Sequence, residues 1–111
     1  MEQADPPLAP AAFLILFALA SGDKHGYAIM QEARRLSDQT LQIGPATLYT
    51  TIQRLLDSDR IREVAGPEHG DTRRKYYRLT GAGKSALNAE LSRMEAMVKK
   101  SKAMRLRLAE S

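Results

Sequence analysis

The sequence of 111 residues contains no cysteine and no tryptophan, and it has only two histidines, two phenylalanines and four tyrosines. Without cysteine, the chain forms no disulfide, senses no redox change through a thiol and ligates no metal through sulfur. The two histidines, His25 and His69, lie in different segments without metal-ligand spacing, so we expect neither a metal nor a cofactor. A P-loop, a glycine-rich dinucleotide fingerprint and a nucleophile motif are also missing, which argues against an enzyme.

A hydrophobic run long enough to span a membrane is missing as well. The almost wholly apolar stretch from Leu8 to Ala20 has thirteen residues, which are too few to span a bilayer, so we expect no membrane partner. Residues 1–7 hold two prolines and two acids but no basic n-region of a secretion signal, which predicts a flexible arm. We therefore expect a cytoplasmic protein with one small domain, whose core a partner subunit would help to complete.

The net charge of +4 is unevenly distributed along the chain. Residues 1–59 hold four basic and seven acidic side chains, whereas residues 60–111 hold thirteen basic and six acidic ones. A basic second half is typical of an electrostatic footprint on nucleic acid, although a basic C-terminal tail would give the same count.

A helix is predicted to start at Pro45, because proline suits the first helical position. An apolar stripe follows at helical spacing: Leu48, Ile52, Leu55 and Leu56. The opposite side carries short or hydrogen-bonding side chains: Ala46, Thr47, Thr50, Gln53, Arg54 and Asp57. Such a face can lie against base edges in a major groove, but it also suits an ordinary solvated helix. At the edge of the stripe, Tyr49 is expected to place its ring in the core and its hydroxyl near a phosphate.

A basic hairpin is predicted after this helix, with strands at residues 61–65 and 75–80. Turn-forming residues lie between them: Gly66, Pro67, Gly70 and Asp71. The candidate DNA contacts of the hairpin are Arg73, Arg74, Lys75 and Tyr77. A helix with a polar face followed by a basic hairpin indicates a winged helix-turn-helix, in which the helix contacts bases and the wing contacts phosphates. The alternative is that the basic residues form a solvated charge run.

Two helices are predicted before this pair. The first covers Leu8 to Ala20, and it is so evenly apolar that one domain could cover only one of its faces. The alternative is a fully wrapped core helix. The second covers about residues 24–38, with Asp23 as N-cap and the apolar stripe Tyr27, Met30, Ala33 and Leu36. At its start, His25, Gly26 and Tyr27 are candidates for phosphate contact, because glycine lets the main chain approach closely. The alternatives are a surface histidine and a half-buried core tyrosine. Between residues 39 and 44, Leu41 and Ile43 alternate with polar residues and predict a short first strand.

A last helix is predicted from Thr80, as N-cap, to about Leu106. Its apolar residues recur at steps of four, three and four, at Leu87, Leu91, Met94 and Val98. This heptad spacing favours pairing with another helix. We expect a homodimer, with an interface formed by Phe13, Phe17, Leu87, Leu91, Met94 and Val98.

Three pieces of the sequence carry a family resemblance: HGYAI at 25–29, GPATLYTTIQRLLDSDRI at 44–61 and RRKYYRLTGAGKSAL at 73–87. In their order and spacing the chain resembles the PadR family of bacterial transcriptional regulators over about residues 8–105, in the short subgroup with a single C-terminal helix. The resemblance implies a winged-helix dimer that binds operator DNA, usually as a repressor.

The expected fold is therefore mainly α with a small β-hairpin wing (α+β). It has a winged helix-turn-helix DNA-binding domain at residues 8–80 and a C-terminal dimerisation helix at 81–111. The expected function is sequence-specific regulation, by repression through promoter occlusion, on double-stranded operator DNA. Release by a small-molecule effector is left open: some relatives hold aromatic drugs between tryptophans, and this chain has none. The alternative function is a winged-helix protein-interaction module without DNA binding, which the slightly acidic helix after Pro45 favours.

Overall fold

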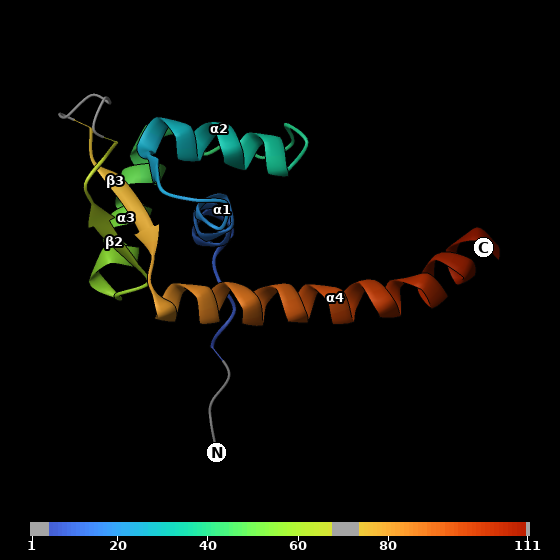
Figure 1. The fold of residues 1–111 in the computed structure, drawn as a ribbon. Coiled ribbons are helices and arrows are strands. Elements are labelled where there is room, and N and C mark those ends of the chain that lie inside the picture. The colour runs from blue at the N-terminus through green and yellow to red at the C-terminus, as the bar shows by residue number, and fades with distance from the viewer. Residues whose placement is uncertain (1–4, 68–73, 111) are drawn as a thin grey trace, which may run out of the picture.

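The computed structural model describes residues 5–67 and 74–110. In chain order its elements are α1 (Pro10–Leu19), β1 (Lys24–His25), α2 (Gly26–Leu36), α3 (Pro45–Asp57), β2 (Ile61–Val64), β3 (Tyr76–Leu79) and α4 (Gly81–Glu110). Figure 1 shows α1, α2, α3 and the three strands as one head, from whose base α4 extends far to the side. The expected winged helix-turn-helix with a long C-terminal helix is confirmed. None of the helices in the described ranges has the length and apolar character needed to cross a membrane.

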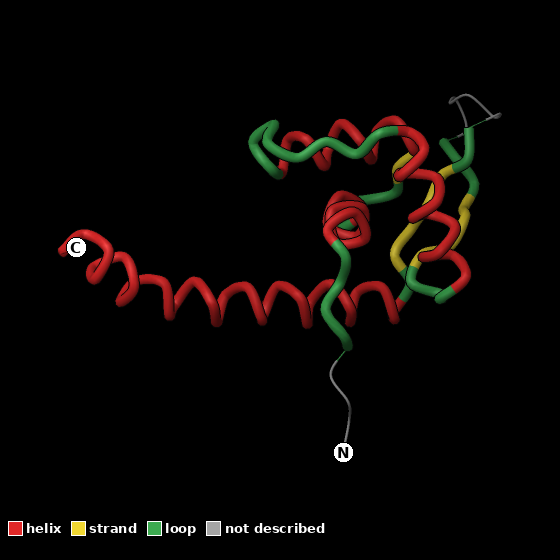
Figure 2. Tube along the Cα trace, turned by 180° about the vertical axis from the view of Figure 1, so that it is seen from behind, coloured by secondary structure: helices red, strands yellow, loops and turns green. Residues whose placement is uncertain are grey.

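The segment before α1 crosses α4, as Figures 1 and 2 both show. There the Arg93 guanidinium donates to the Asp5 carbonyl over 2.8 Å and to the Glu90 carboxylate over 3.0 Å. The same Glu90 oxygen accepts the backbone N–H of Leu8 at 2.7 Å. The bonds from Arg93 and then Leu8 lower the pKa of Glu90, against the opposing effect of burial. The described end of the expected flexible arm is thus fastened to α4.

The centre of the core is α1. Its buried residues are Leu14, Ile15, Leu16, Ala18 and Leu19. They pack against α2, α3, α4 and β3. The expectation that one domain could cover only one face of this helix is wrong, because α4 passes beneath α1 and closes the side that the head leaves open. Phe13 and Phe17 stay partly exposed, with ring centroids 5.4 Å apart.

The strands form an antiparallel sheet in the order β1-β3-β2. The hairpin is confirmed, and Ile61 pairs with Leu79 at its base. The short first strand expected around Leu41 is wrong: β1 lies before α2 instead, where His25 pairs with Tyr76. There the chain between α1 and α2 pairs with Tyr76 and Tyr77 on the edge of β3 that β2 leaves open. The segment of Leu41 is a loop in which the Ser37 hydroxyl accepts the Leu41 N–H at 3.1 Å.

The start of α2 also differs from the expectation. The N-cap is His25, whose Nδ1 accepts the Ala28 N–H at 3.2 Å. The expected cap, Asp23, instead accepts two hydrogen bonds from Arg78 of β3, at 2.9 and 2.7 Å. The buried face is centred on Ile29 and not on Tyr27, which is 58% exposed. Tyr27 therefore lies outside the apolar stripe in which the sequence placed it, and the alternative of a half-buried core tyrosine is wrong.

The start of α4 is fastened to the turn between α3 and β2. As expected, Thr80 caps the helix: its hydroxyl accepts the Gly83 N–H at 3.0 Å, and it donates to the Asp59 carbonyl at 2.6 Å. The Thr80 N–H donates to the Arg60 carbonyl at 3.1 Å. Gly83 lies so close to this carbonyl that a Cβ atom would overlap its oxygen. The helix then runs to Glu110, beyond the expected end near Leu106.

Candidate nucleic-acid interface

The outer face of α3 is exposed as expected. Gly44 is the N-cap, Pro45 is in the first turn, and the side chains that hold the helix to the core are Leu48, Thr51, Ile52 and Leu55. The exposed face carries Ala46, Thr47, Thr50, Gln53, Arg54 and Asp57. Near its end, the Gln53 amide donates to the Asp57 carboxylate at 2.9 Å, one helical turn farther along the same face.

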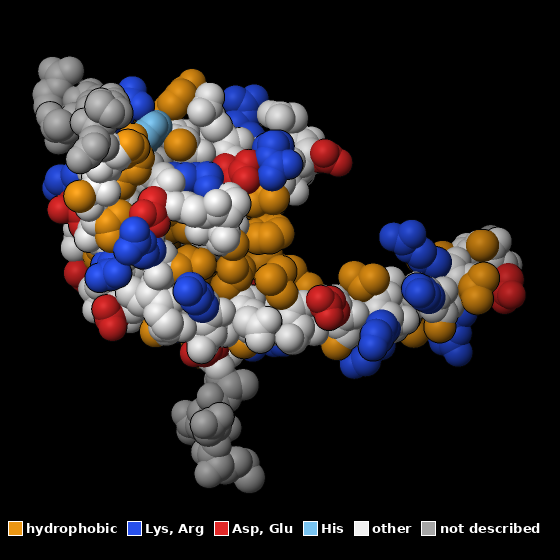
Figure 3. Space-filling view, in the orientation of Figure 1, with side chains coloured by type: hydrophobic (Ala, Val, Ile, Leu, Met, Phe, Trp, Pro, Cys, Tyr) orange, Lys and Arg blue, Asp and Glu red, His pale blue; other side chains and the backbone are white. Residues whose placement is uncertain are grey.

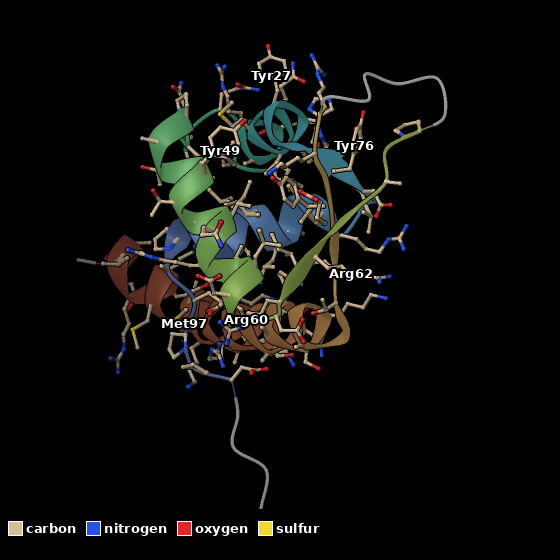
Figure 4. All side chains as sticks on the ribbon, turned by 90° about the vertical axis from the view of Figure 1, so that its left-hand side faces the viewer. Tyr27, Tyr49, Arg60, Arg62, Tyr76 and Met97 are labelled. Atoms are coloured by element: carbon tan, nitrogen blue, oxygen red, sulfur yellow. The ribbon has the colours of Figure 1, made fainter. Side chains whose placement is uncertain are left out.

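A hollow of about 340 Å³ lies where α2, α3 and the wing meet. It is lined by His25, Gly26, Tyr27, Tyr49, Arg74, Lys75 and Tyr77. All seven are candidates that the sequence placed in three separate segments. In Figure 4, Tyr27, Tyr49 and Tyr76 lie around one end of the molecule, and Arg60 and Met97 lie at the other. Arg73, the remaining wing candidate, lies outside the described residues.

Tyr49 belongs to this hollow and not to the core. Its side chain is 56% exposed, so the expectation of a core ring is wrong. A Cβ atom on Gly26 would lie 3.0 Å from the Tyr49 hydroxyl and 3.3 Å from Leu48. The glycine at the start of α2 therefore lets α2 and α3 approach each other, which is a packing reason that the sequence did not reveal.

Tyr77 forms the floor of the hollow and is buried. Burial, then the charge of Glu63 and the proximity of Tyr49, raise the pKa of its phenol. The hydroxyl therefore stays protonated at neutral pH and adds no negative charge to a cationic surface.

His25 lies between the start of α2 and the wing. Its Nε2 is 2.8 Å from Nη1 of Arg74, and its ring meets that of Tyr76 edge-on at 5.3 Å. Burial, and secondarily the positive charge of Arg74, lower the pKa of His25 below its ordinary value. The imidazole is therefore neutral at pH 7.

The basic residues of the sheet have different roles. Arg78 is committed to the fold through its ion pair with Asp23, and its guanidinium lowers the pKa of that carboxyl. Lys75 lines the hollow and lies 3.8 Å from Glu63 across the hairpin. This role of Asp23 was not predicted, because an aspartate directly before a helix is typical of an N-cap.

The candidate dimer residues lie on two helices that meet at an angle. Figure 3 shows apolar side chains gathered in the inner angle between the head and α4. Leu87 is only 6% exposed and belongs to the core of its own subunit. Phe13, Phe17, Leu91 and Met94 are partly exposed, and Val98 is 60% exposed. Farther along α4, the exposed large apolar side chains are Met97, Met104, Leu106 and Leu108.

Two packed helices, an exposed third helix and a hairpin define the class as a winged helix-turn-helix protein. The chain belongs to the transcriptional regulator PadR-like family, whose model matches residues 15–89. This is a family of transcription regulators and not of enzymes.

Individual relatives agree with this assignment. An uncharacterised protein from Lysinibacillus sphaericus is 38% identical over 86 residues, which cover 78% of each chain. A solved transcriptional regulator from Clostridium thermocellum is 31% identical with a TM-score of 0.69, over 84% of this chain and 87% of the other. Bacillus subtilis PadR, solved in complex with operator DNA, is 24% identical with a TM-score of 0.66. That match covers 78% of this chain and 48% of PadR, and it supports the fold.

Proposed function

We propose that this protein is a homodimeric, sequence-specific regulator that binds double-stranded operator DNA from the cytoplasm. The observation that carries the proposal is the 340 Å³ hollow, which joins the start of α2, α3 and the basic wing beside an exposed polar helix face. Bacillus subtilis PadR, which shares the fold, was solved on operator DNA. In a dimer, two α3 helices would enter successive major grooves of the operator. The bound dimer would then repress transcription by occluding the promoter. Release by a small ligand that changes the separation of the two α3 helices is part of the same proposal.

Within this proposal α3 reads bases and the wing holds phosphates. The exposed Thr50 hydroxyl can bond a base edge, and its methyl can pack on a thymine methyl. Arg54, one turn farther along, has the reach for a guanine or a phosphate. Arg74 and Lys75 carry positive charges that attract the DNA phosphates. Because the phosphates are the same whatever the base sequence, these contacts add affinity and not specificity.

Thr50→Ala is expected to lower affinity for the operator by about 1–3 kcal/mol and to leave affinity for a scrambled duplex nearly unchanged. Arg74→Ala is expected to weaken both duplexes alike, because phosphates carry no sequence information. The measurement is a pair of binding curves per variant, on the duplex from the gene's own promoter and on its scrambled control. Equal losses on both duplexes for Thr50→Ala, or an operator-only loss for Arg74→Ala, would reverse these assignments.

The exposed length of α4 supports pairing with a second copy. From Met94, further residues follow at steps of three and four: Met97, Ser101, Met104 and Leu108. Val98 extends this heptad-like strip, and Leu91 at its start is partly buried against the core of its own subunit. An uncovered apolar strip of this length on a monomer is a liability that dimerisation removes.

Met94→Glu is expected to shift the dimer towards monomer at micromolar concentration and to weaken operator binding together with dimerisation. Asn88→Glu introduces the same charge at an exposed position of α4 and is the matched control, expected to remain dimeric. Light scattering gives the mass, which should be twice the 12.3 kDa of one chain for the wild type. A wild-type mass of one chain at every concentration tested would reject the dimer.

A further inference from the structure

A cavity of about 510 Å³ lies between α3 and the segment that leads into α1. One wall is formed by residues 6–12, and the other by α3 residues at steps of four, three and four: Thr47, Thr51, Arg54 and Ser58. Leu55 and Arg60 complete the lining. Tyr49, which lines the hollow, projects from the opposite side of the helix. The cavity is therefore separate from the hollow, and its volume is within the roughly 300–1,000 Å³ of small-molecule sites.

Both walls of this cavity are held in place by the fold. The Leu8 N–H donates to Glu90 at 2.7 Å, and the Arg93 guanidinium donates to the Asp5 carbonyl at 2.8 Å, which fastens the first wall to α4. In the second wall, Thr51 and Leu55 are buried against the core. The cavity is thus formed before any ligand arrives, as is usual for small-molecule sites.

The lining combines an aliphatic wall with a basic edge. Residues 6–12 and Leu55 contribute only proline, leucine and alanine, and none of the lining residues, all within the described ranges, is aromatic or acidic. Arg54 and Arg60 supply two positive charges. Within residues 5–67 and 74–110, neither guanidinium has a hydrogen-bond or ion-pair partner. Because Arg60 is also half-buried, an anionic group in the cavity would replace part of the hydration that it has lost.

We propose that this cavity binds a small aliphatic carboxylate. The hydrocarbon chain lies along residues 6–12, and the carboxylate accepts from Arg60 and Arg54, for which a guanidinium is well suited. The absence of an aromatic lining residue favours an aliphatic over an aromatic ligand. For its effect on DNA this inference rests on the proposed function, and it gives the release by a small ligand a defined site.

The cavity is connected to the face of α3 that is proposed to read bases. Thr47, Thr51 and Arg54 also line a depression on that face, together with Ala46 and Thr50. A carboxylate held by Arg54 takes this side chain away from the DNA and adds a negative charge beside the approaching phosphates. Operator DNA and the carboxylate are therefore expected to lower each other's affinity by the same factor.

Octanoate is the probe for the site, titrated calorimetrically into the full chain without DNA. Affinity should rise about fourfold per methylene from butanoate to octanoate, because each buried methylene leaves water. 1-Octanol, which has the same chain without the charge, should bind about tenfold more weakly. Backbone ¹H–¹⁵N shifts on binding should centre on Ala11, Ala12 and Thr51. A flat chain-length series, equal binding of 1-octanol, or shifts centred on Phe13 and Met94 would overturn the site.

Two arginines two positions apart provide a matched pair of variants. Arg60 lines the cavity, whereas Arg62 is exposed on β2 and does not, and Figure 4 shows Arg60 by the end of α3 and Arg62 out along the sheet. Arg60→Gln should lower octanoate affinity about tenfold, and Arg60→Lys, which keeps the charge, should restore most of it. Arg62→Gln should bind octanoate like the wild type. Equal losses in the two glutamine variants would mean that only the net charge matters, which contradicts the proposal.

The coupling to DNA is measured on the operator duplex with and without saturating octanoate. Octanoate should lower operator affinity of the wild type about tenfold and that of Arg60→Gln much less at the same concentration. Without octanoate the two proteins should bind the operator alike, because Arg60 is not among the proposed DNA contacts. Octanoate binding that leaves operator affinity unchanged would overturn the regulatory role. A protein that binds octanoate in this cavity but retains no DNA would refute the proposed function and leave the carboxylate site standing.

Discussion

Replacing Gly83 with alanine is expected to lower the free energy of unfolding by about 3 kcal/mol. The added Cβ atom would overlap the Arg60 carbonyl oxygen and lie 3.0 Å from the carbonyl carbon and 3.3 Å from Leu79. The carbonyl cannot move aside freely, because it accepts the Thr80 N–H at 3.1 Å. The first turn of α4 must therefore shift away from the head, and Ala86 and Leu87, buried on that side of α4, shift with it.

The matched control is Gly81→Ala, in the same turn of the helix. Gly81 is exposed and has no atom within 4 Å of an added Cβ, so alanine there is expected to stabilise by up to about 1 kcal/mol through helix propensity. Urea unfolding at one fixed protein concentration compares the two variants, because dimerisation makes apparent stability depend on concentration. Equal effects of the two alanines would mean that α4 does not approach the Arg60 carbonyl so closely.

Affinity for duplex DNA is expected to fall about a thousandfold between 50 and 200 mM salt. Arg73, Arg74 and Lys75 occur in each subunit of the proposed dimer, so roughly six phosphates would be neutralised, and each releases counterions on binding. Arg74 and Lys75 line the hollow, whereas Arg78 is paired with Asp23. A titration of binding against salt gives the slope.

Arg74→Ala should reduce that slope by about two, one contact per subunit. Lys100→Ala removes the same charge from an exposed position of α4, away from the wing, and should leave the slope unchanged. A flat salt response of the wild type would argue against the wing as a phosphate clamp. It would favour a winged-helix module that binds protein instead.

Elements with a strong local pattern were predicted well from the sequence. Pro45 and the stripe that starts at Leu48 located α3, the turn residues after Val64 located the hairpin, and Thr80 located the start of α4. The wrong expectations arose where a residue distant in the sequence overrode a local signal. Aspartate is a favoured N-cap residue, but the Asp23 carboxylate accepts two hydrogen bonds from Arg78 on β3 instead.

The sequence alone determined which segments are helical, where the basic wing lies and which side of α3 stays polar, because helical periodicity, proline and turn residues act over a few positions. Only the tertiary structure decided which donor meets which acceptor. His25 and Arg74 are 49 positions apart, Asp23 and Arg78 are 55 apart, and Asp5 and Arg93 are 88 apart. Such contacts depend on how α1, α4 and the sheet pack together, and no local pattern in the chain encodes that packing. The candidate residues were therefore visible in the sequence, whereas the hollow that unites them was not.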